Sequence, residues 1–273
     1  MTAVAGAATP SHRRVAQVRP VSQGQVIRSE WIKLRSVRSS WFLLAATVLG
    51  IAGIGLLVSY VDNAHWATMS ASARADLNPL NQSLIGVNLA ELTVGVLGVL
   101  AVTGEYATGM IRATFAAVPR RFPVLAAKAG VVAAVTFAAC LAAVLIAVAG
   151  GQALLGSHGI SLSHPQAVRA VFGAALYLTV VAVIGVGLGF LTRSTAGGIA
   201  TVLGVLLVLP IVVSALPGSS AIERYLPSMA GRAVFIMNGG PGMSSPWAGF
   251  GIFLFYGIVL VAAAAWALRK RDA

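Results

Sequence analysis

One acidic residue, Glu91, lies deep inside an apolar run of this sequence. A carboxylate is costly inside a membrane, so a residue in that position is a candidate for ion relay, substrate contact or ion pairing. The alternative is a structural role, in which the side chain is protonated or hydrogen-bonded to Asn88 or to a Ser or Thr of a neighbouring helix. We expect no Asp, Lys, Arg or His within the membrane to pair with it, and this gives a proton-coupled transporter little support.

The other residue types that do chemistry occur without the spacing that the chemistry requires. There is no GxxxxGK[ST] phosphate loop, and none of the lysines (Lys33, Lys128 and Lys270) follows a glycine. The histidines lie in the N-terminal tail or in loops without an HExxH motif, and the single cysteine, Cys140, lies in an apolar run. We therefore expect no enzyme, no metal site and no cofactor bound by this chain.

The elements that must position these residues are long apolar runs. Hydrophobic residues make up 58% of the chain and charged residues only 10%, whereas soluble domains carry about 25% charged residues. A helix of about 20 apolar residues crosses the hydrocarbon of a membrane. We expect an all-α integral membrane protein whose transmembrane domain covers residues 40–268, with six spans near residues 40–60, 83–103, 124–149, 170–191, 197–216 and 247–268.

Positive charge is divided unevenly between the two sides of this arrangement. The Lys and Arg residues expected outside are Arg74, Arg169, Arg224 and Arg232, and all the others fall on the opposite side. Because cytoplasmic loops carry the excess of Lys and Arg, both termini are expected in the cytoplasm, with residues 269–273 as a short tail. The net charge of +12 is then a topology signal, and we expect no nucleic acid partner.

The segment before the first run has two parts. Residues 1–22 are expected to form a flexible cytoplasmic tail, since most of them are small or polar with scattered Arg. Residues 23–39 combine apolar residues at helical spacing with basic residues on the other faces, which is typical of an amphipathic helix at the membrane interface. The residues that define it are Ile27, Trp31, Lys33, Leu34 and Arg35. A basic flank that only fixes the orientation is the alternative.

The charged segment from Glu105 to Arg121 predicts a short helix on the cytoplasmic side. Glu105 and Arg112 are seven residues apart, which would place them on one helical face and allow them to pair. Pro119 disfavours the α conformation at Val118 and so predicts the end of the helix. An amphipathic helix joined to a span suits docking on another protein, and an ordinary solvated loop helix is the alternative.

Two further features concern the last two runs. Pro210 lies within the fifth run and predicts a kink. The loop over residues 217–246 is punctuated by prolines, and the segments between them are expected to form short helices that lie on the outer leaflet or dip into it.

Three stretches together resemble the permease subunits of type-two ABC transporters. The first is SEWIKLRSVRSSW, which enters the first run, and another is RYLPSMAGRAVF, which precedes the last. The most specific is similar to the family pattern E-Y-x-x-G-x-I-R-x-T-(x)n-P-x-R. Its positions here are Glu105, Tyr106, Gly109, Ile111, Arg112, Thr114, Pro119 and Arg121.

The resemblance implies a role for each stretch. Residues 23–39 would be an elbow helix in contact with membrane lipid, and Glu105 to Arg121 would be a coupling helix that contacts an ABC ATPase subunit. The stretch RYLPSMAGRAVF would form re-entrant external helices. Two permease copies, or this chain with a related permease, would form an exporter in a bacterial plasma membrane together with two ATPase subunits, which use the ATP. A largely apolar pathway suits drugs, antibiotics, peptides and lipid-like substrates equally. The alternatives are a secondary transporter that uses Glu91 and a membrane protein that transports nothing.

Overall fold

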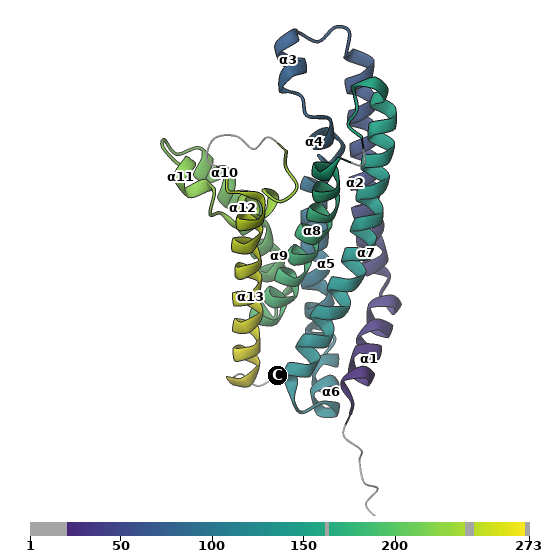
Figure 1. Cartoon of the computed structure of the whole chain (residues 1–273). Coiled ribbons are helices and arrows are strands. Elements are labelled where there is room, and N and C mark those ends of the chain that lie inside the picture. Colours follow the sequence, from purple (N-terminus) through teal and green to yellow (C-terminus); the bar gives the residue numbers. More distant parts are fainter. Residues whose placement is uncertain (1–20, 162–163, 238–242, 271–273) are drawn as a thin grey trace, which may run out of the picture.

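The computed structural model describes residues 21–161, 164–237 and 243–270, and in these residues it contains helices and no strand (Figure 1). The predicted all-α class is confirmed. The predicted tail over residues 1–22 lies almost wholly outside the described residues, as do residues 271–273 of the predicted C-terminal tail.

Six helical segments are long and apolar enough to cross a membrane, as predicted. Each predicted span falls within one of these segments or overruns it by two residues at most. The segments are built from α2 (Arg38–His65), α4 and α5 (Pro79–Ser83 and Val87–Ala107), α7 (Arg121–Leu155), α8 (Pro165–Thr192), α9 to α10 (Thr195–Leu203 and Leu209–Ser214) and α13 (Pro246–Lys270).

The centre of the bundle is the pair α5 and α8. Of the most apolar part of α8, 78% is buried, against 28% for α2 and for α13. Glycines bring α5 and α8 together, because a Cβ at Gly98 would overlap the carbonyl oxygen of Ala182 and one at Gly185 would overlap that of Gly95. Small residues allow such close approach where helices pack in lipid.

The short helices gather at the two ends of the bundle (Figure 1). One end carries α1 (Gln23–Ser36), α6 (Met110–Ala117) and the end of α13. The opposite end carries α3 (Ala71–Asp76), α4, α11 (Ser220–Glu223) and α12 (Pro227–Arg232). Both ends of the described chain therefore lie at the same end of the bundle, as six spans require. That this end faces the cytoplasm remains a prediction from the Lys and Arg distribution.

The fifth span changes its hydrogen-bond register next to Pro210. Residues Gly204–Val208 form a π-helix, in which the Leu209 N–H donates to the carbonyl oxygen of Gly204. Pro210 has no N–H to donate to the carbonyl four residues before it, and the wider turn lies directly before that missing bond. The structure thus shows a π-helical turn directly before Pro210, and the kink expected at Pro210 remains a prediction.

The segment before the last span reaches into the bundle. Gly231 of α12 lies so close to the rings of Tyr177 and Phe253 that a Cβ there would come within 2.6 and 2.7 Å of them. Asn81 fixes the end of this segment, since its side chain both donates to the Met237 carbonyl and accepts from the Met237 N–H, each at 2.8 Å. The sequence predicted that this segment lies on the outer leaflet or dips into it. In the structure, α12 packs inward against Tyr177 and Phe253.

The α5–α8 contact generates a stability prediction. Gly98→Ala should destabilise the protein by about 1–3 kcal/mol, because the added methyl group forces two backbones apart. Gly53→Ala is the control, since a Cβ there meets nothing within 4 Å and alanine favours the helix by about 0.5–1 kcal/mol. The measurement is the thermal unfolding midpoint in detergent. Equal midpoints for the two variants would show that the close approach of α5 and α8 at Gly98 does not limit the size of the side chain there.

Candidate functional site: a buried ion cluster beside α6

The predicted coupling segment contains a sharp break. Helix α5 ends at Ala107, Gly109 adopts a left-handed conformation with φ of 72°, and α6 begins at Met110. Only glycine adopts this conformation without steric cost, which explains the glycine in the middle of the motif. Helix α6 ends at Ala117 with Val118 as its C-cap, as Pro119 predicted.

The predicted pairing of Glu105 with Arg112 is wrong. The break at Gly109 places the two residues on different helices, so their seven-residue spacing does not bring them to one face. Arg112 is exposed and its side chain has no ion-pair partner among the described residues. The Glu105 side chain is buried, with its Oε1 2.6 Å from the Nζ of Lys128 and 3.1 Å from the Nζ of Lys33.

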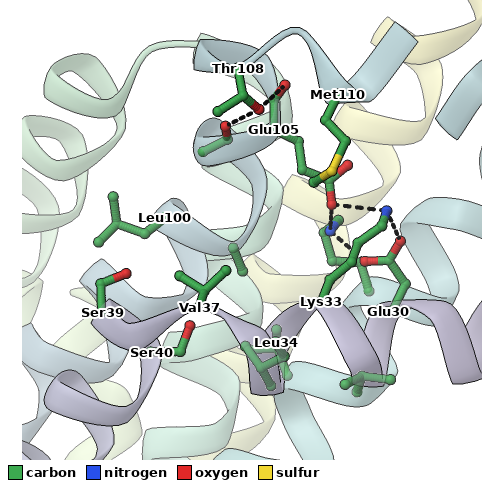
Figure 2. Close-up of a pocket in the computed structure, with 15 residues that line it drawn as sticks. Glu30, Lys33, Leu34, Val37, Ser39, Ser40, Leu100, Glu105, Thr108 and Met110 are labelled. Carbon is green, nitrogen blue, oxygen red and sulfur yellow. Dashed lines mark hydrogen bonds and ion pairs between the residues drawn. The ribbon is translucent and has the colours of Figure 1, made fainter. Parts of the chain in front are cut away.

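Glu30 of α1 completes a cluster of four charged side chains (Figure 2). Its Oε1 lies 2.7 Å from the Nζ of Lys33 and its Oε2 lies 2.5 Å from the Nζ of Lys128. Each carboxylate therefore contacts both lysines, and the formal charges cancel. We call Glu30, Lys33, Glu105 and Lys128 the ion cluster.

The ion cluster is buried and its charges are mutually compensated. Glu30, Lys128 and Glu105 are 2%, 3% and 4% exposed, and an isolated charge at such a depth would cost several kcal/mol. Lys33 is less deeply buried, and its ammonium group also donates to the hydroxyl of Thr114 on α6 at 3.1 Å. Burial by itself lowers the pKa of Lys33, but the hydrogen bonds and negative charges of Glu30 and Glu105 outweigh burial and raise it.

The ion cluster joins four helices at one end of the bundle. Glu30 and Lys33 come from α1, Glu105 from α5 and Lys128 from α7, while Thr114 adds α6. A cavity of about 420 Å³ lies beside the cluster, and apart from these charged groups its walls are mainly apolar. Figure 2 shows Leu34, Val37 and Leu100 around it. The arrangement has no obvious catalytic chemistry; it ties α6 mechanically to three other helices.

Comparison with protein families assigns the chain to a family. Residues 26–210, from α1 to the fifth span, match the ABC-2 family transporter proteins. The chain belongs to the ABC-2 transporter family. Proteins of this family are the membrane-spanning component of an ABC transporter, so association with an ABC ATPase follows. A comparison with curated proteins found no match.

Two further motif residues of this ABC-2 permease, Ile111 and Arg121, help to hold α6 against the bundle. Ile111 and Phe115 are the buried side chains of α6, and the guanidinium carbon of Arg121 lies 5.4 Å from the centre of the Phe115 ring. Arg121 also donates to the carbonyl oxygen of Leu268 at 3.0 Å, which connects the start of α7 to the last span. Pro119 is exposed after the end of α6.

Tyr106 packs where α5 meets the turn between the fourth and fifth spans. Its ring contacts Phe190 edge-on, with 6.5 Å between the ring centres. The guanidinium carbon of Arg193 lies 5.5 Å from the centre of the Tyr106 ring, a distance suited to a cation–π contact. The aromatic position of the motif therefore serves packing.

The predicted segment 23–39 begins with helix α1 (Gln23–Ser36), whose apolar residues lie in two environments, and its place at the membrane interface remains a prediction. Leu34 is buried against the bundle, whereas Ile27 and Trp31 are each 44% exposed. Lys33, which was expected on a polar face, points into the ion cluster, and Arg35 is exposed. The helix faces the bundle with Val26, Glu30 and Leu34, because the charge of Glu30 is compensated there.

Sequence reasoning missed Glu30 and Lys128. Lys128 was counted among the basic residues that set the orientation, although it stands inside the third predicted span. Glu30 is the one acidic residue before the first span. These two unusual positions were the available signal, since a buried charge requires a partner of opposite sign.

Glu91 does have a partner of opposite charge, which corrects the expectation from sequence. Its Oε1 lies 2.6 Å from Nη2 of Arg232, and the hydroxyl of Tyr177 donates to its Oε2. Arg232 ends α12, in the segment that the sequence placed outside the bundle. The compensated pair supports a structural role for Glu91 and connects α12 to the central helices.

The ion cluster generates a double-mutant prediction. Lys128→Met should destabilise the permease by about 3–5 kcal/mol, because the cluster is left with one lysine for two buried carboxylates. Adding Glu30→Gln removes a charge of each sign and should restore part of the loss, with a coupling of about 0.5–3 kcal/mol. The measurement is the free energy of unfolding in detergent. Additive single effects would contradict the cluster.

Arg112→Gln is the matched control for this cycle. The change removes a positive charge from the same end of the bundle, but the side chain is exposed. Its effect on the free energy of unfolding should stay within about 0.5 kcal/mol.

The pair of Glu91 and Arg232 generates a second prediction. Arg232→Gln should destabilise the permease because Glu91, which is 0% exposed, loses its countercharge. The double variant Glu91→Gln with Arg232→Gln should be more stable than Arg232→Gln alone, since it leaves no buried unpaired charge. Thermal unfolding midpoints of the three proteins provide the comparison. A double variant less stable than Arg232→Gln would show that the pair is not what holds α12.

Proposed function

We propose that this chain is the permease of an ATP-driven exporter and that α6 is the element through which the ATPase subunit moves it. The observation that carries this proposal is the ion cluster. An ABC permease without a phosphate loop depends on a partner for ATP hydrolysis, so force must enter through a contact at the end of the bundle. The ion cluster ties one candidate contact, α6, to α1, α5 and α7.

The two faces of α6 suit this role. Ile111 and Phe115 are buried against the bundle, whereas Met110 and Arg112 are exposed at the end of the molecule. An ATPase subunit would contact the exposed face. A displacement of α6 would then pass to the spans through the buried face and through the hydrogen bond from Lys33 to Thr114.

The complete transporter would hold two copies of the permease, or this chain with a related one, and two ATPase subunits in a bacterial plasma membrane. The family resemblance supports this composition and the outward direction of transport. The apolar interior supports an amphipathic or apolar substrate, such as a drug, an antibiotic, a peptide or a lipid-like molecule. The compensation of Glu91 by Arg232 gives no support to a secondary transporter based on Glu91.

Arg112→Glu tests the coupling role without touching the ion cluster. The variant reverses an exposed charge on α6, so the permease should insert and fold normally while it loses its ATPase subunit on purification from native membranes. A drop of about ten-fold in recovered ATPase corresponds to about 1.4 kcal/mol at the contact. The readout is the amount of co-purified ATPase relative to the amount of permease. The rate of ATP hydrolysis by the purified sample is measured as well.

Arg224→Glu is the control for this experiment. Arg224 is also exposed, but it lies beside α11 at the opposite end of the bundle. The control should retain the ATPase. Equal recovery with both variants would show that α6 is not the docking helix, and recovery of no ATPase even with the unmodified permease would overturn the proposed function.

A further inference from the structure

An apolar groove of about 750 Å³ lies along α1, α2 and α7, apart from the motif residues. Its walls include Ile27 and Trp31 of α1, Trp41 and Ala45 of α2, and Ala134 and Ala138 of α7. All the side chains that line it are hydrophobic. Val131 belongs to its wall and also to that of the cavity beside the ion cluster, so the two spaces lie on either side of the contact between α1 and α7.

The groove is long enough to hold part of a lipid acyl chain. Along α2 its lining runs from Trp41 to Val48, and along α7 from Val131 to Ala139. At 1.5 Å per residue, these stretches extend about 10 and about 12 Å into the bundle. Alanines supply much of the α7 wall, and these small side chains leave room for an extended hydrocarbon chain between the helices.

Two arginines lie next to the mouth of this groove. Arg28 and Arg35 are exposed residues of α1, and at 100° per residue they lie roughly 40–60° around the helix from Trp31. Neither side chain forms an ion pair in the described part of the chain. The nearby acidic residue, Glu30, is already bound to Lys33 and Lys128. The mouth therefore carries positive charge that no acidic side chain of the described residues neutralises.

The two tryptophans place this mouth at the boundary between polar and apolar surroundings. The Nε1 of Trp41 donates to the carbonyl oxygen of Arg35 at 2.8 Å, while its ring lines the groove. Trp31 lines the groove from the other side and is 44% exposed. Tryptophan is enriched at the level of lipid headgroups because one part of its side chain is polar and the other apolar.

We propose that this groove binds an acyl chain of an anionic phospholipid whose phosphate group contacts Arg28 and Arg35. A zwitterionic lipid fills the apolar groove equally well but brings no net charge to the arginines. A second copy of this chain is disfavoured as the occupant, because on a two-fold axis it would bring the same uncompensated arginines to the contact. Basic residues near a membrane surface attract anionic lipid by about 1 kcal/mol each.

Tryptophan quenching by brominated lipid tests this directly. The full-length permease is reconstituted with Trp66, Trp247 and Trp266 changed to Phe, so that Trp31 and Trp41 report on the groove. Bilayers contain phosphatidylcholine with brominated phosphatidylglycerol, or phosphatidylglycerol with brominated phosphatidylcholine. The quenching by brominated phosphatidylglycerol in the first bilayer is divided by the quenching by brominated phosphatidylcholine in the second. This ratio gives the preference for the anionic lipid at the groove relative to the bulk bilayer.

We expect a clear preference for phosphatidylglycerol in this protein. Replacing either Arg28 or Arg35 with Gln should lower the preference about five-fold, the equivalent of about 1 kcal/mol. Arg120→Gln is the charge control, because Arg120 is exposed at the N-cap of α7, about 16 Å along the helix from Val131, where the groove lining begins on α7; it should leave the preference unchanged.

A second pair of variants separates the groove from the headgroup contact. Ala45→Phe places a ring in the groove and should reduce quenching by both lipids, whereas Ala46→Phe adds the same ring at the neighbouring exposed position outside the lining and should not. Equal quenching by the two lipids, or a preference that survives loss of both arginines, would overturn the proposal. Absence of quenching by either lipid would also overturn it, since something other than lipid would then fill the groove.

Discussion

The compensation of four buried charges is the constraint on which one end of this permease depends. Glu30, Lys33, Glu105 and Lys128 come from three helices, and none of them can be buried there without the others. Their pairing fixes the position of α1 against α5 and α7. Helix α6 has only eight residues, too few for stability by itself, and it is held through Ile111, Phe115 and the hydrogen bond to Thr114.

The opposite end of the bundle uses the same principle on a smaller scale. Arg232 brings α12 to Glu91, and Tyr177 completes the contact. Between the two ends, glycines let α5 and α8 approach closely. The bundle is thus apolar and closely packed in its middle, with buried ion pairs where the short helices attach. These attachments are the places at which a change of charge would alter the position of an element.

The fold could be predicted because hydropathy and length act locally. Six apolar runs, the end of α6 before Pro119 and the irregularity before Pro210 all follow from properties of neighbouring residues. The ion pairs could not be predicted in this way. Glu91 and Arg232 are 141 residues apart in the chain, and Arg232 lies in a segment whose prolines indicated an external loop. The predicted pairing of Glu105 with Arg112 was wrong because it assumed one continuous helix from Glu105 to Arg112. The helix is broken at Gly109, so a spacing of seven residues does not place the two side chains on one face. The assignment of α6 as a coupling helix rests on the motif, and geometry adds only that it is firmly attached.

The order of the ion-cluster residues along the chain has a consequence for synthesis at the membrane. Glu30, Lys33 and Glu105 emerge from the ribosome before Lys128, so until the third span is made the growing chain holds two of these carboxylates and one lysine. Charge balance is reached only when Lys128 arrives at the start of α7. Helix α1 and the first three spans therefore form a single assembly unit, in which the third span completes the burial of residues made long before it.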